Sequence, residues 1–240
     1  MRTLCPCSLQ WVAADMEARY ARNIPALTEA ECLSLRQRRV LVVGCGGLGG
    51  HIIDQLSRIG VGHLRVVDGD VFEPSNLNRQ LLSSVPLLGT SKAKAAADHI
   101  ACVNPEVATE AVEAILDASN VSELLADCDI VLDALDNIPS RKILAAACSE
   151  AGIPYVYGAI SGWVAQAAVS IPGDDLMEIL FPEEVEIRDK SVLSFTPALC
   201  ASLQVSLCVK LLTGRAVESG TVYHFDILNL ELESIPLMLI

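Results

Sequence analysis

The chain has 240 residues, of which 52% are hydrophobic and 20% are charged, a composition that can fill the core of one large α/β domain or two small ones. The formal net charge of −13 argues against a nucleic-acid backbone as the main partner. The N-terminal residues carry several charges and do not resemble a secretory signal, and no stretch reaches the length of a membrane span. Because nine cysteines occur without such a signal, we expect a cytoplasmic protein with reduced thiols.

Strands and helices are predicted to alternate along most of the chain. Residues 1–37 are expected to form an N-terminal arm, helical and polar from residue 10 onward. A first βαβ unit follows, with a strand at 39–43, a helix at 47–59 and a second strand at 63–68. Residues 69–80 are rich in turn formers and are predicted to be a loop.

The later elements predict the architecture of the sheet. We expect, in order, a helix at 89–102, a strand at 107–112, a helix at 119–126, a strand at 129–133, a helix at 139–151, strands at 154–160 and 163–171, an acidic connection at 173–195 that we interpret as a mobile loop, a helix at 197–213, and strands at 220–227 and 229–236. The last two strands are predicted to form an antiparallel hairpin. This order indicates an α/β fold with a Rossmann-like, mostly parallel sheet, helices on both faces and antiparallel strands at the C-terminal end.

A glycine-rich turn lies between the first strand and the first helix of this βαβ unit. In the G-x-G-x-x-G pattern, Gly44 permits a tight turn, Gly46 lets the backbone approach a phosphate, and Gly49 lets the helix pack close to the strand. The helix N-terminus then offers free N–H groups to an anion. No Lys-Ser or Lys-Thr follows the glycines, so the turn is not a Walker loop. The pattern predicts a nucleotide or phosphate site.

Four charged residues follow where a nucleotide would need them, although each alone also fits an ordinary surface charge. Asp68 ends the second strand, where an acidic residue meets ribose hydroxyls. Arg79 and Lys92 are cations that can hold phosphates, and Asp136 follows a further strand and can bind Mg²⁺. A dehydrogenase needs neither a metal carboxylate nor two phosphate cations, whereas an adenylation site needs both, because negative charge develops on the leaving pyrophosphate. The set favours ATP over NAD.

An ordered series of motifs runs through nearly the whole chain, from about Arg19 to the last strand. It comprises Gly44-x-Gly46-Gly47-Leu48-Gly49, Asp68-Gly69-Asp70, Ser75-Asn76-Leu77-Asn78-Arg79-Gln80, Gly89-x-x-Lys92 and Asp136-Asn137. This series resembles the MoeB/ThiF/HesA family, the bacterial relatives of the ubiquitin-activating enzymes. The resemblance implies that residues 1–240 form a single ThiF-type adenylation domain.

The resemblance also implies a reaction, an adenylyltransferase activity. ATP·Mg²⁺ would bind at the glycine turn, the C-terminal glycine carboxylate of a ubiquitin-like sulfur-carrier protein would attack the α-phosphate, and pyrophosphate would leave. A Gly-Gly carrier tail suits such a site because it is thin and unbranched. Residues 173–195 match the family's crossover loop, which covers such a tail. The carrier would serve molybdopterin, thiamine or a related sulfur pathway.

Roles for individual residues follow from the same resemblance. Asp68 would hold the ribose, Asp136 would bind Mg²⁺, and Arg22 matches an arginine that reaches into the partner subunit's site, which implies a homodimer with composite sites. The expected nucleotide-binding set is Gly44, Gly46, Gly47, Gly49, Asp68, Asp70, Asn76, Gln80 and Asn137. The expected catalytic set is Arg22, Arg79, Lys92 and Asp136.

The cysteines set this chain apart from many family members. Two C-x-x-C pairs bind a structural zinc in those members, but residues 173–195 and the residues after the last strand contain no cysteine, so we predict no zinc of that kind. The crossover-loop cysteine that some members use covalently is absent too, and we predict adenylation without a covalent cysteine step. Cys200 stays open as an alternative nucleophile because it lies near a helix start. Cys5 and Cys7 form a close pair of open role.

Three other functions stay open. A tRNA threonylcarbamoyladenosine dehydratase-like adenylating enzyme belongs to the same superfamily and often lacks the zinc cysteines, although the acidic charge argues against tRNA. A non-catalytic scaffold that binds a carrier or nucleotide would not need the catalytic set named above. A dinucleotide-dependent oxidoreductase would need a hydride-transfer constellation, and none follows Asp68.

Overall fold

The computed structural model describes residues 16–174, 176–182 and 191–237. Its centre is an eight-stranded sheet in the order β3-β2-β1-β4-β5-β6-β7-β8. The strands are β1 (Arg39–Val43), β2 (His63–Val67), β3 (Ala108–Val112), β4 (Ile130–Asp133), β5 (Tyr155–Ser161), β6 (Val164–Ser170), β7 (Thr221–Asp226) and β8 (Glu231–Pro236). Strands from β3 to β5 pair in parallel, and β5 to β8 pair antiparallel. The predicted fold class is therefore confirmed.

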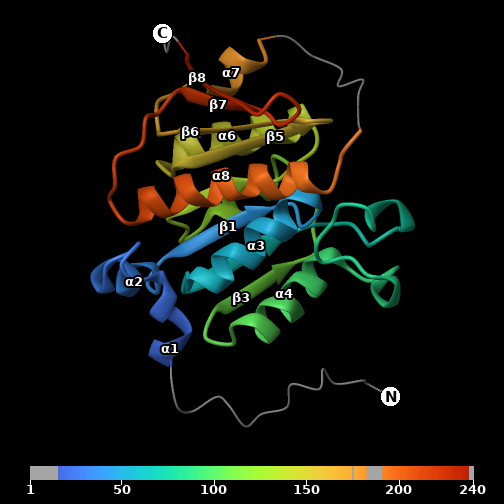
Figure 1. Cartoon of the computed structure of the whole chain (residues 1–240). Coiled ribbons are helices and arrows are strands. Elements are labelled where there is room, and N and C mark those ends of the chain that lie inside the picture. Colours follow the sequence, from blue (N-terminus) through green and yellow to red (C-terminus); the bar gives the residue numbers. More distant parts are fainter. Residues whose placement is uncertain (1–15, 175, 183–190, 238–240) are drawn as a thin grey trace.

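Helices cover both faces of the sheet. They are α1 (Met16–Tyr20), α2 (Glu29–Leu35), α3 (Gly47–Ile59), α4 (Lys92–Val103), α5 (Val121–Leu125), α6 (Ile138–Ala151), α7 (Leu176–Leu180) and α8 (Phe195–Leu212), with short 3₁₀ turns at Ala21–Asn23, Pro74–Asn76 and Val85–Leu87. In Figure 1, α3, α4 and α8 lie in front of the sheet and α6 lies behind it. Each face buries its own apolar cluster.

Strand β1 is buried on both faces of the sheet, which accounts for the continuous apolar run before the glycines. Val40 and Val42 belong to the cluster under α3 and α8, whereas Leu41 and Val43 belong to the cluster under α6. Side chains of a strand alternate between the two faces of its sheet, and both faces are covered here. The apolar run ends with the strand at Val43, and the glycine turn begins at the carboxyl end of β1.

The N-terminal arm is not one helix, as the sequence had suggested. The described part holds the short helices α1 and α2, separated around Pro25, whose ring removes an amide donor and cannot continue a helix. Helix α2 starts afresh at a capping box in which Thr28 and Glu31 each bind the other's backbone. Residues 1–15 of the predicted arm, including Cys5 and Cys7, lie outside the described residues.

The predicted connection at 173–195 contains a helix that the sequence analysis missed. Helix α7 places Leu176 and Met177 in the buried cluster behind the sheet. Residues 175 and 183–190 of this segment lie outside the described residues. The segment continues into α8, whose length and hydropathy would also suit a membrane span, but 56% of α8 is buried inside the fold. Its buried residues join the core cluster on the front of the sheet, which is the position of a core helix.

Candidate active site

A cleft of about 410 Å³ opens at the carboxyl ends of the parallel strands. It lies beside β1, from which the chain continues to β2 on one side and β4 lies on the other. Ligands of open α/β sheets bind at such a switch in strand order. The predicted residues that line the cleft are Gly44, Gly46, Gly47, Asp68, Asp70, Arg79, Gln80, Lys92, Asp136 and Asn137. Residues far apart in the sequence are thus brought to one place.

The glycine turn has the tight geometry that the sequence predicted. Gly44 has φ +98, and a Cβ there would lie 2.5 Å from the carbonyl oxygen of Ala134. A Cβ on Gly49 would lie 1.8 Å from the carbonyl oxygen of Gly44, so Gly49 sets the helix against the turn without lining the cleft. Gly46 is the N-cap of α3 and offers no side-chain cap. The amides of the first turn of α3 therefore face the cleft without a side-chain partner.

Asp68 follows β2 and organises the turns around it. Its Oδ2 accepts a hydrogen bond from the amide of Cys45 at 2.7 Å, and its Oδ1 accepts one from the amide of Asp70 at 2.8 Å. Burial raises the pKa of Asp68, while these amide donors act in the opposite direction. Each carboxylate oxygen still has a further lone pair, so a bond to a ribose hydroxyl is compatible with these contacts. The ribose contact itself stays a prediction.

Lys92 reaches the cleft because backbone hydrogen bonds join residues 70–72, which follow β2, to residues 90–92, which lead into α4. The amide of Phe72 donates to the carbonyl of Thr90, and the amide of Lys92 donates to the carbonyl of Asp70. Ser91 caps α4, so Lys92 stands at the first residue of that helix. The Lys92 Nζ lies 2.9 Å from Oδ2 of Asp70, and only 9% of its side chain is exposed. The ammonium group is held at the rim by a carboxylate that is itself largely exposed.

Arg79 and Gln80 flank the start of α3. Arg79 lies beside Gly47 and donates from Nη1 to the carbonyl of Ser75 and to Oδ1 of Asn78, both at 2.9 Å. The side chain of Gln80 lies against Gly46, and its buried Oε1 has no hydrogen-bond partner among the described residues. A donor from a ligand, or a water, would satisfy that oxygen.

Asn76 does not line the cleft. Its Oδ1 accepts from the amide of Glu73 at 3.0 Å, which closes the short 3₁₀ turn that precedes Arg79. The predicted contact of Asn76 with phosphate remains a prediction, and its visible contact is structural.

Asp136 and Asn137 lie in the turn between β4 and α6. Asn137 is the N-cap of α6 and accepts from the amide of Ser140 at 2.9 Å. Asp136 is exposed, and among the described residues its carboxylate accepts one long hydrogen bond, of 3.5 Å, from Nδ2 of Asn137. Its oxygens are therefore available to a cation in the cleft.

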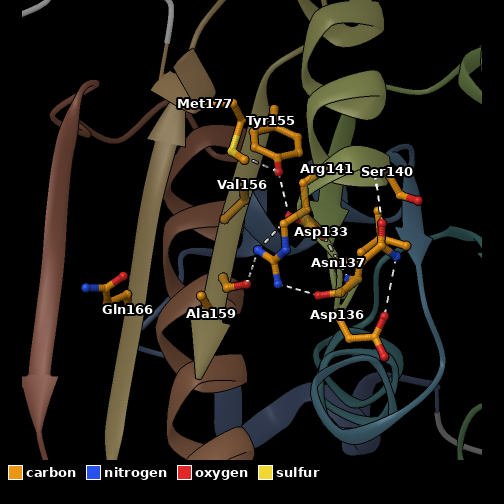
Figure 2. A network of polar contacts seen from close by, with 12 residues as sticks. Asp133, Asp136, Asn137, Ser140, Arg141, Tyr155, Val156, Ala159, Gln166 and Met177 are labelled. Atoms are coloured by element: carbon orange, nitrogen blue, oxygen red, sulfur yellow. Dashed lines mark hydrogen bonds and ion pairs between the residues drawn. The ribbon is translucent and has the colours of Figure 1, made fainter. Parts of the chain in front are cut away.

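A buried ionic network that no sequence motif had indicated lies directly beneath this turn (Figure 2). Arg141 on α6 donates from Nη1 to Oδ2 of Asp133 at 3.0 Å and to the carbonyl of Gly158 at 2.7 Å, and from Nη2 to the carbonyl of Leu135. The hydroxyl of Tyr155 donates to Oδ2 of Asp133 at 2.5 Å. Arg141 lines the cleft although it is 5% exposed. An arginine within the apolar pattern of a predicted helix was the signal that could have revealed it.

The cleft also has apolar walls that no motif had indicated. Ile115 and Leu116, from the loop after β3, lie on one side, and Tyr157 and Phe181 lie on the other. Ile115 is 73% exposed. These surfaces could accommodate the flat face of a base and an extended chain, respectively.

Besides Gly49 and Asn76, two further predicted residues lie outside the cleft. Cys200 is fully buried, and burial raises the pKa of its thiol to about 12, which argues against its use as a nucleophile. Arg22 is exposed in the turn after α1, where neighbouring Asn23 donates to the carbonyl of Ile59 at the far end of α3. At roughly 1.5 Å per residue, the two ends of this 13-residue helix lie about 18 Å apart. Arg22 therefore lies at the edge of the sheet opposite the cleft of its own chain.

Comparison with known families matches residues 20–238 to the ThiF family. The chain belongs to the ThiF family. It is 40% identical over 210 residues to the SAMP-activating enzyme E1 of Haloferax volcanii, a match that covers 84% of this chain and 77% of that protein. It is 33% identical over 212 residues to the molybdopterin-synthase adenylyltransferase of Escherichia coli, with 85% of each chain covered.

Solved structures agree on the fold of this ThiF-family chain. The structure of E. coli MccB with ATP superposes with a TM-score of 0.78 at 19% identity, covering 91% of this chain and 71% of that one. At this level of identity the likeness supports the Rossmann-like fold and nothing finer. The family assignment rests instead on the sequence matches, whose relatives are named as enzymes of the adenylyltransferase or E1 type.

Proposed function

We propose that this ThiF-family protein adenylates the C-terminal glycine of a ubiquitin-like sulfur-carrier protein with ATP·Mg²⁺ and releases pyrophosphate. Its relatives are named as a SAMP-activating E1 and a molybdopterin-synthase adenylyltransferase, and this supports the class of reaction. ATP and a protein carrier are both available in the cytoplasm, which is where we expect the enzyme to act.

The observation that carries this proposal is the arrangement of charge around the first turn of α3. Arg79 and Lys92 lie on one side of the cleft, and Asp136 lies in the turn after β4. Cations that contact the β- and γ-phosphates stabilise the charge that develops on departing pyrophosphate. Unpaired amides of the helix N-terminus add to the same field. A scaffold that only binds a carrier has no need of this arrangement.

The residues present suit a magnesium ion that is held mainly by the nucleotide. Mg²⁺ commonly takes one or two carboxylates together with substrate phosphates and waters, and Asp136 is an exposed carboxylate in the cleft. Among the described residues, no group of three or more His, Cys, Asp or Glu side chains forms a metal site of its own. When bound with the nucleotide, Mg²⁺ would neutralise phosphate charge.

The residues of this chain would act in a definite order. Asp68 would orient the ribose, and Arg79 and Lys92 would hold the triphosphate so that the α-phosphate faces the wall of the cleft next to β5. The carrier's terminal carboxylate would enter past Ala159 and Ile160, which line that side. It would attack the α-phosphorus, the bond to the bridging oxygen of pyrophosphate would break, and an acyl-adenylate would form. A two-glycine tail has no side chains that would hinder its entry.

Arg22 fits the proposal only if a second copy supplies it. Its position at the opposite edge of the sheet keeps it from the cleft of its own chain, as described above. We therefore propose a homodimer in which each Arg22 enters the partner subunit's cleft and neutralises phosphate charge there, as arginine fingers do. Mixed dimers of Arg22→Ala and Asp136→Ala chains would then regain part of the activity that each variant lacks alone, and no recovery would count against the exchange.

Pyrophosphate release from ATP·Mg²⁺ tests the proposed reaction. The acceptors are Gly-Gly-ended sulfur carriers, the same carriers without the last glycine, and threonylcarbamoylated tRNA. We expect release with an intact carrier and none with its shortened form. We also expect Asp136→Ala to abolish release with its fold and dimer intact, and the exposed variant Asp98→Ala on α4 to match the wild type.

The other outcomes are equally informative. Release with the tRNA alone would assign the protein to the dehydratase branch. ATP binding without release across a broad set of carriers would favour a scaffold. Unchanged turnover in Asp136→Ala would refute the role given to that carboxylate.

A further inference from the structure

Two buried charges take no direct part in the reaction proposed above. Asp133, the last residue of β4, is 0% exposed, and Arg141 on α6 is 5% exposed. Burying an ion pair removes two charges from water, and an apolar pair of the same volume often stabilises a fold equally well. A buried pair at the edge of a cleft therefore calls for a reason other than stability.

The contacts of this pair converge on the backbone of one residue. The Leu135 amide donates to Oδ1 of Asp133 at 2.8 Å, and the Leu135 carbonyl accepts from Nη2 of Arg141. Arg141 also binds the carbonyl of Gly158, so it connects the turn after β4 to strand β5. Leu135 is thus held at both its N–H and its C=O, and the next residue in the chain is Asp136.

Asp136 has little else to orient it. Its side chain is exposed, and within the described part of the chain its carboxylate contacts only the side-chain amide of Asn137, at 3.5 Å. Figure 2 shows the carboxylate projecting away from the network that holds the preceding backbone. The main chain therefore sets the direction of the Cα–Cβ bond from which the carboxylate extends.

Tyr155 completes the network from strand β5. Its hydroxyl donates to the same Oδ2 of Asp133 that accepts from Arg141, and its ring is 1% exposed. Gln204 on α8 donates to the main-chain carbonyl of Asp133 at 2.8 Å. The carboxylate is therefore fixed from several directions and has no freedom to turn from Leu135.

We propose that Tyr155, Asp133 and Arg141 are positioning residues that fix the backbone at Leu135 and thereby aim the Asp136 carboxylate at the magnesium-bound nucleotide. The inference rests on the proposed function, because it assigns Asp136 to that ion. None of the three residues needs to touch the substrate for this role.

The variant Tyr155→Phe tests the inference with the least disturbance. It keeps the ring and the Asp133–Arg141 pair and removes one donor to the carboxylate. Binding of a non-hydrolysable ATP analogue is measured by calorimetry over a range of Mg²⁺ concentrations, and also without the ion. We expect the Mg²⁺ concentration that gives half-maximal enhancement of nucleotide affinity to rise about tenfold. The reason is that the charged Asp133 carboxylate, which holds the backbone before Asp136, loses one hydrogen bond. Affinity without Mg²⁺ is expected to stay the same.

A control and a double variant separate positioning from general loosening of the fold. Ile130→Val removes one buried methyl group from β4, the strand that ends at Asp133, on the face of the sheet opposite the Asp133 side chain. It is therefore expected to lower thermal stability and to leave the Mg²⁺ dependence unchanged. Asp136→Ala is expected to lose the Mg²⁺ enhancement, and adding Tyr155→Phe to it is expected to change nothing further, because both act through one carboxylate.

Four results would overturn the inference. These are a Tyr155→Phe protein with the Mg²⁺ dependence of the wild type, an equal shift in Ile130→Val, a further loss in the double variant, and a wild-type protein whose affinity does not depend on Mg²⁺. The last result would also remove Asp136 from the proposed function. The first three leave the proposed function intact, so the two failures are distinguishable.

Discussion

Substituting alanine at two adjacent glycines of α3 measures how closely the helix approaches the glycine turn. A Cβ on Gly49 would lie 1.8 Å from the carbonyl oxygen of Gly44 and 2.7 Å from its carbonyl carbon, and both atoms are backbone. An ordinary contact between carbon and oxygen is about 3.3 Å. On Gly50 the nearest atom is Cγ of Leu82 at 3.2 Å, which belongs to a side chain that can move.

These distances lead to opposite expectations for the same chemical change. Alanine in a helix is favoured over glycine by about 1 kcal/mol at either position. Overpacking costs about 1–3 kcal/mol, and a clash between backbone atoms belongs at the upper end. Gly49→Ala is therefore expected to lose about 2 kcal/mol of unfolding free energy, which lowers Tm by about 4–8 °C in a chain of this length. Gly50→Ala is expected to be neutral or more stable by up to about 1 kcal/mol.

Urea unfolding followed by circular dichroism gives both free energies, and calorimetry with ATP gives the functional consequence. If α3 moves to relieve the clash at Gly49, its first-turn amides move as well, so nucleotide affinity is expected to fall in Gly49→Ala and not in Gly50→Ala. Unfolding free energies for the two variants that agree within about 0.5 kcal/mol would refute the close approach, since surface substitutions alone differ by that much.

Three further predictions concern a carboxylate, a thiol and a cation. Glu31→Gln is expected to flatten the dependence of Tm on pH, because Arg215 and Thr28 hold the pKa of Glu31 at about 2, below its ordinary 4.5. The stabilisation from the charged carboxylate is present above pH 4.5 and is lost as the pH falls towards 2. A variant whose Tm depends on pH as the wild type's does would contradict this prediction. Iodoacetamide at pH 8 is expected to spare Cys200 in the native protein and modify it in urea, and equal modification by mass spectrometry would refute its burial. Arg79→Gln is expected to weaken ATP binding about tenfold or more in calorimetry, because a charge-assisted bond to phosphate is lost, whereas unchanged affinity would place phosphate elsewhere.

The sequence predicted the parts of the fold that local patterns determine. The apolar run 40–43, the glycines and the helix after them fold as expected, because a strand buried on both faces and a tight turn both leave clear signals. The antiparallel pairing of β7 and β8 is confirmed as well. The small helix α7 was missed because its apolar residues are few and interrupted by an acidic, proline-broken context.

The sequence could not predict how side chains share partners across the sheet. Asp133 and Arg141 read separately as a strand-end acid and a helix base, and only the fold brings Tyr155 to the same oxygen. Asn76 shows the converse. It stands within a motif that implied phosphate binding, yet its visible bond closes a local turn, and a pattern of residue types does not distinguish these two uses.

The balance of charge in the cleft is compatible with the polyanion that the proposed function requires, although the chain as a whole is acidic. The chain carries −13 overall, but the charged residues that line the cleft are three cations (Arg79, Lys92, Arg141) and three anions (Asp68, Asp70, Asp136), and the buried Asp133 behind Arg141 brings the local sum to −1. Exposed charges farther away than about 8 Å are largely screened at physiological salt, so this local balance governs binding.

The pairing of these charges then decides which cation is most available to phosphate. Lys92 is bound to Asp70, and Arg141 is bound to the buried Asp133. Among the residues that the structure describes, Arg79 has only neutral acceptors, the carbonyl of Ser75 and the amide oxygen of Asn78. Its positive charge is thus uncompensated beside the first turn of α3, where the helix dipole has the same sign. An anion at this point neutralises both, and it breaks no ion pair on arrival.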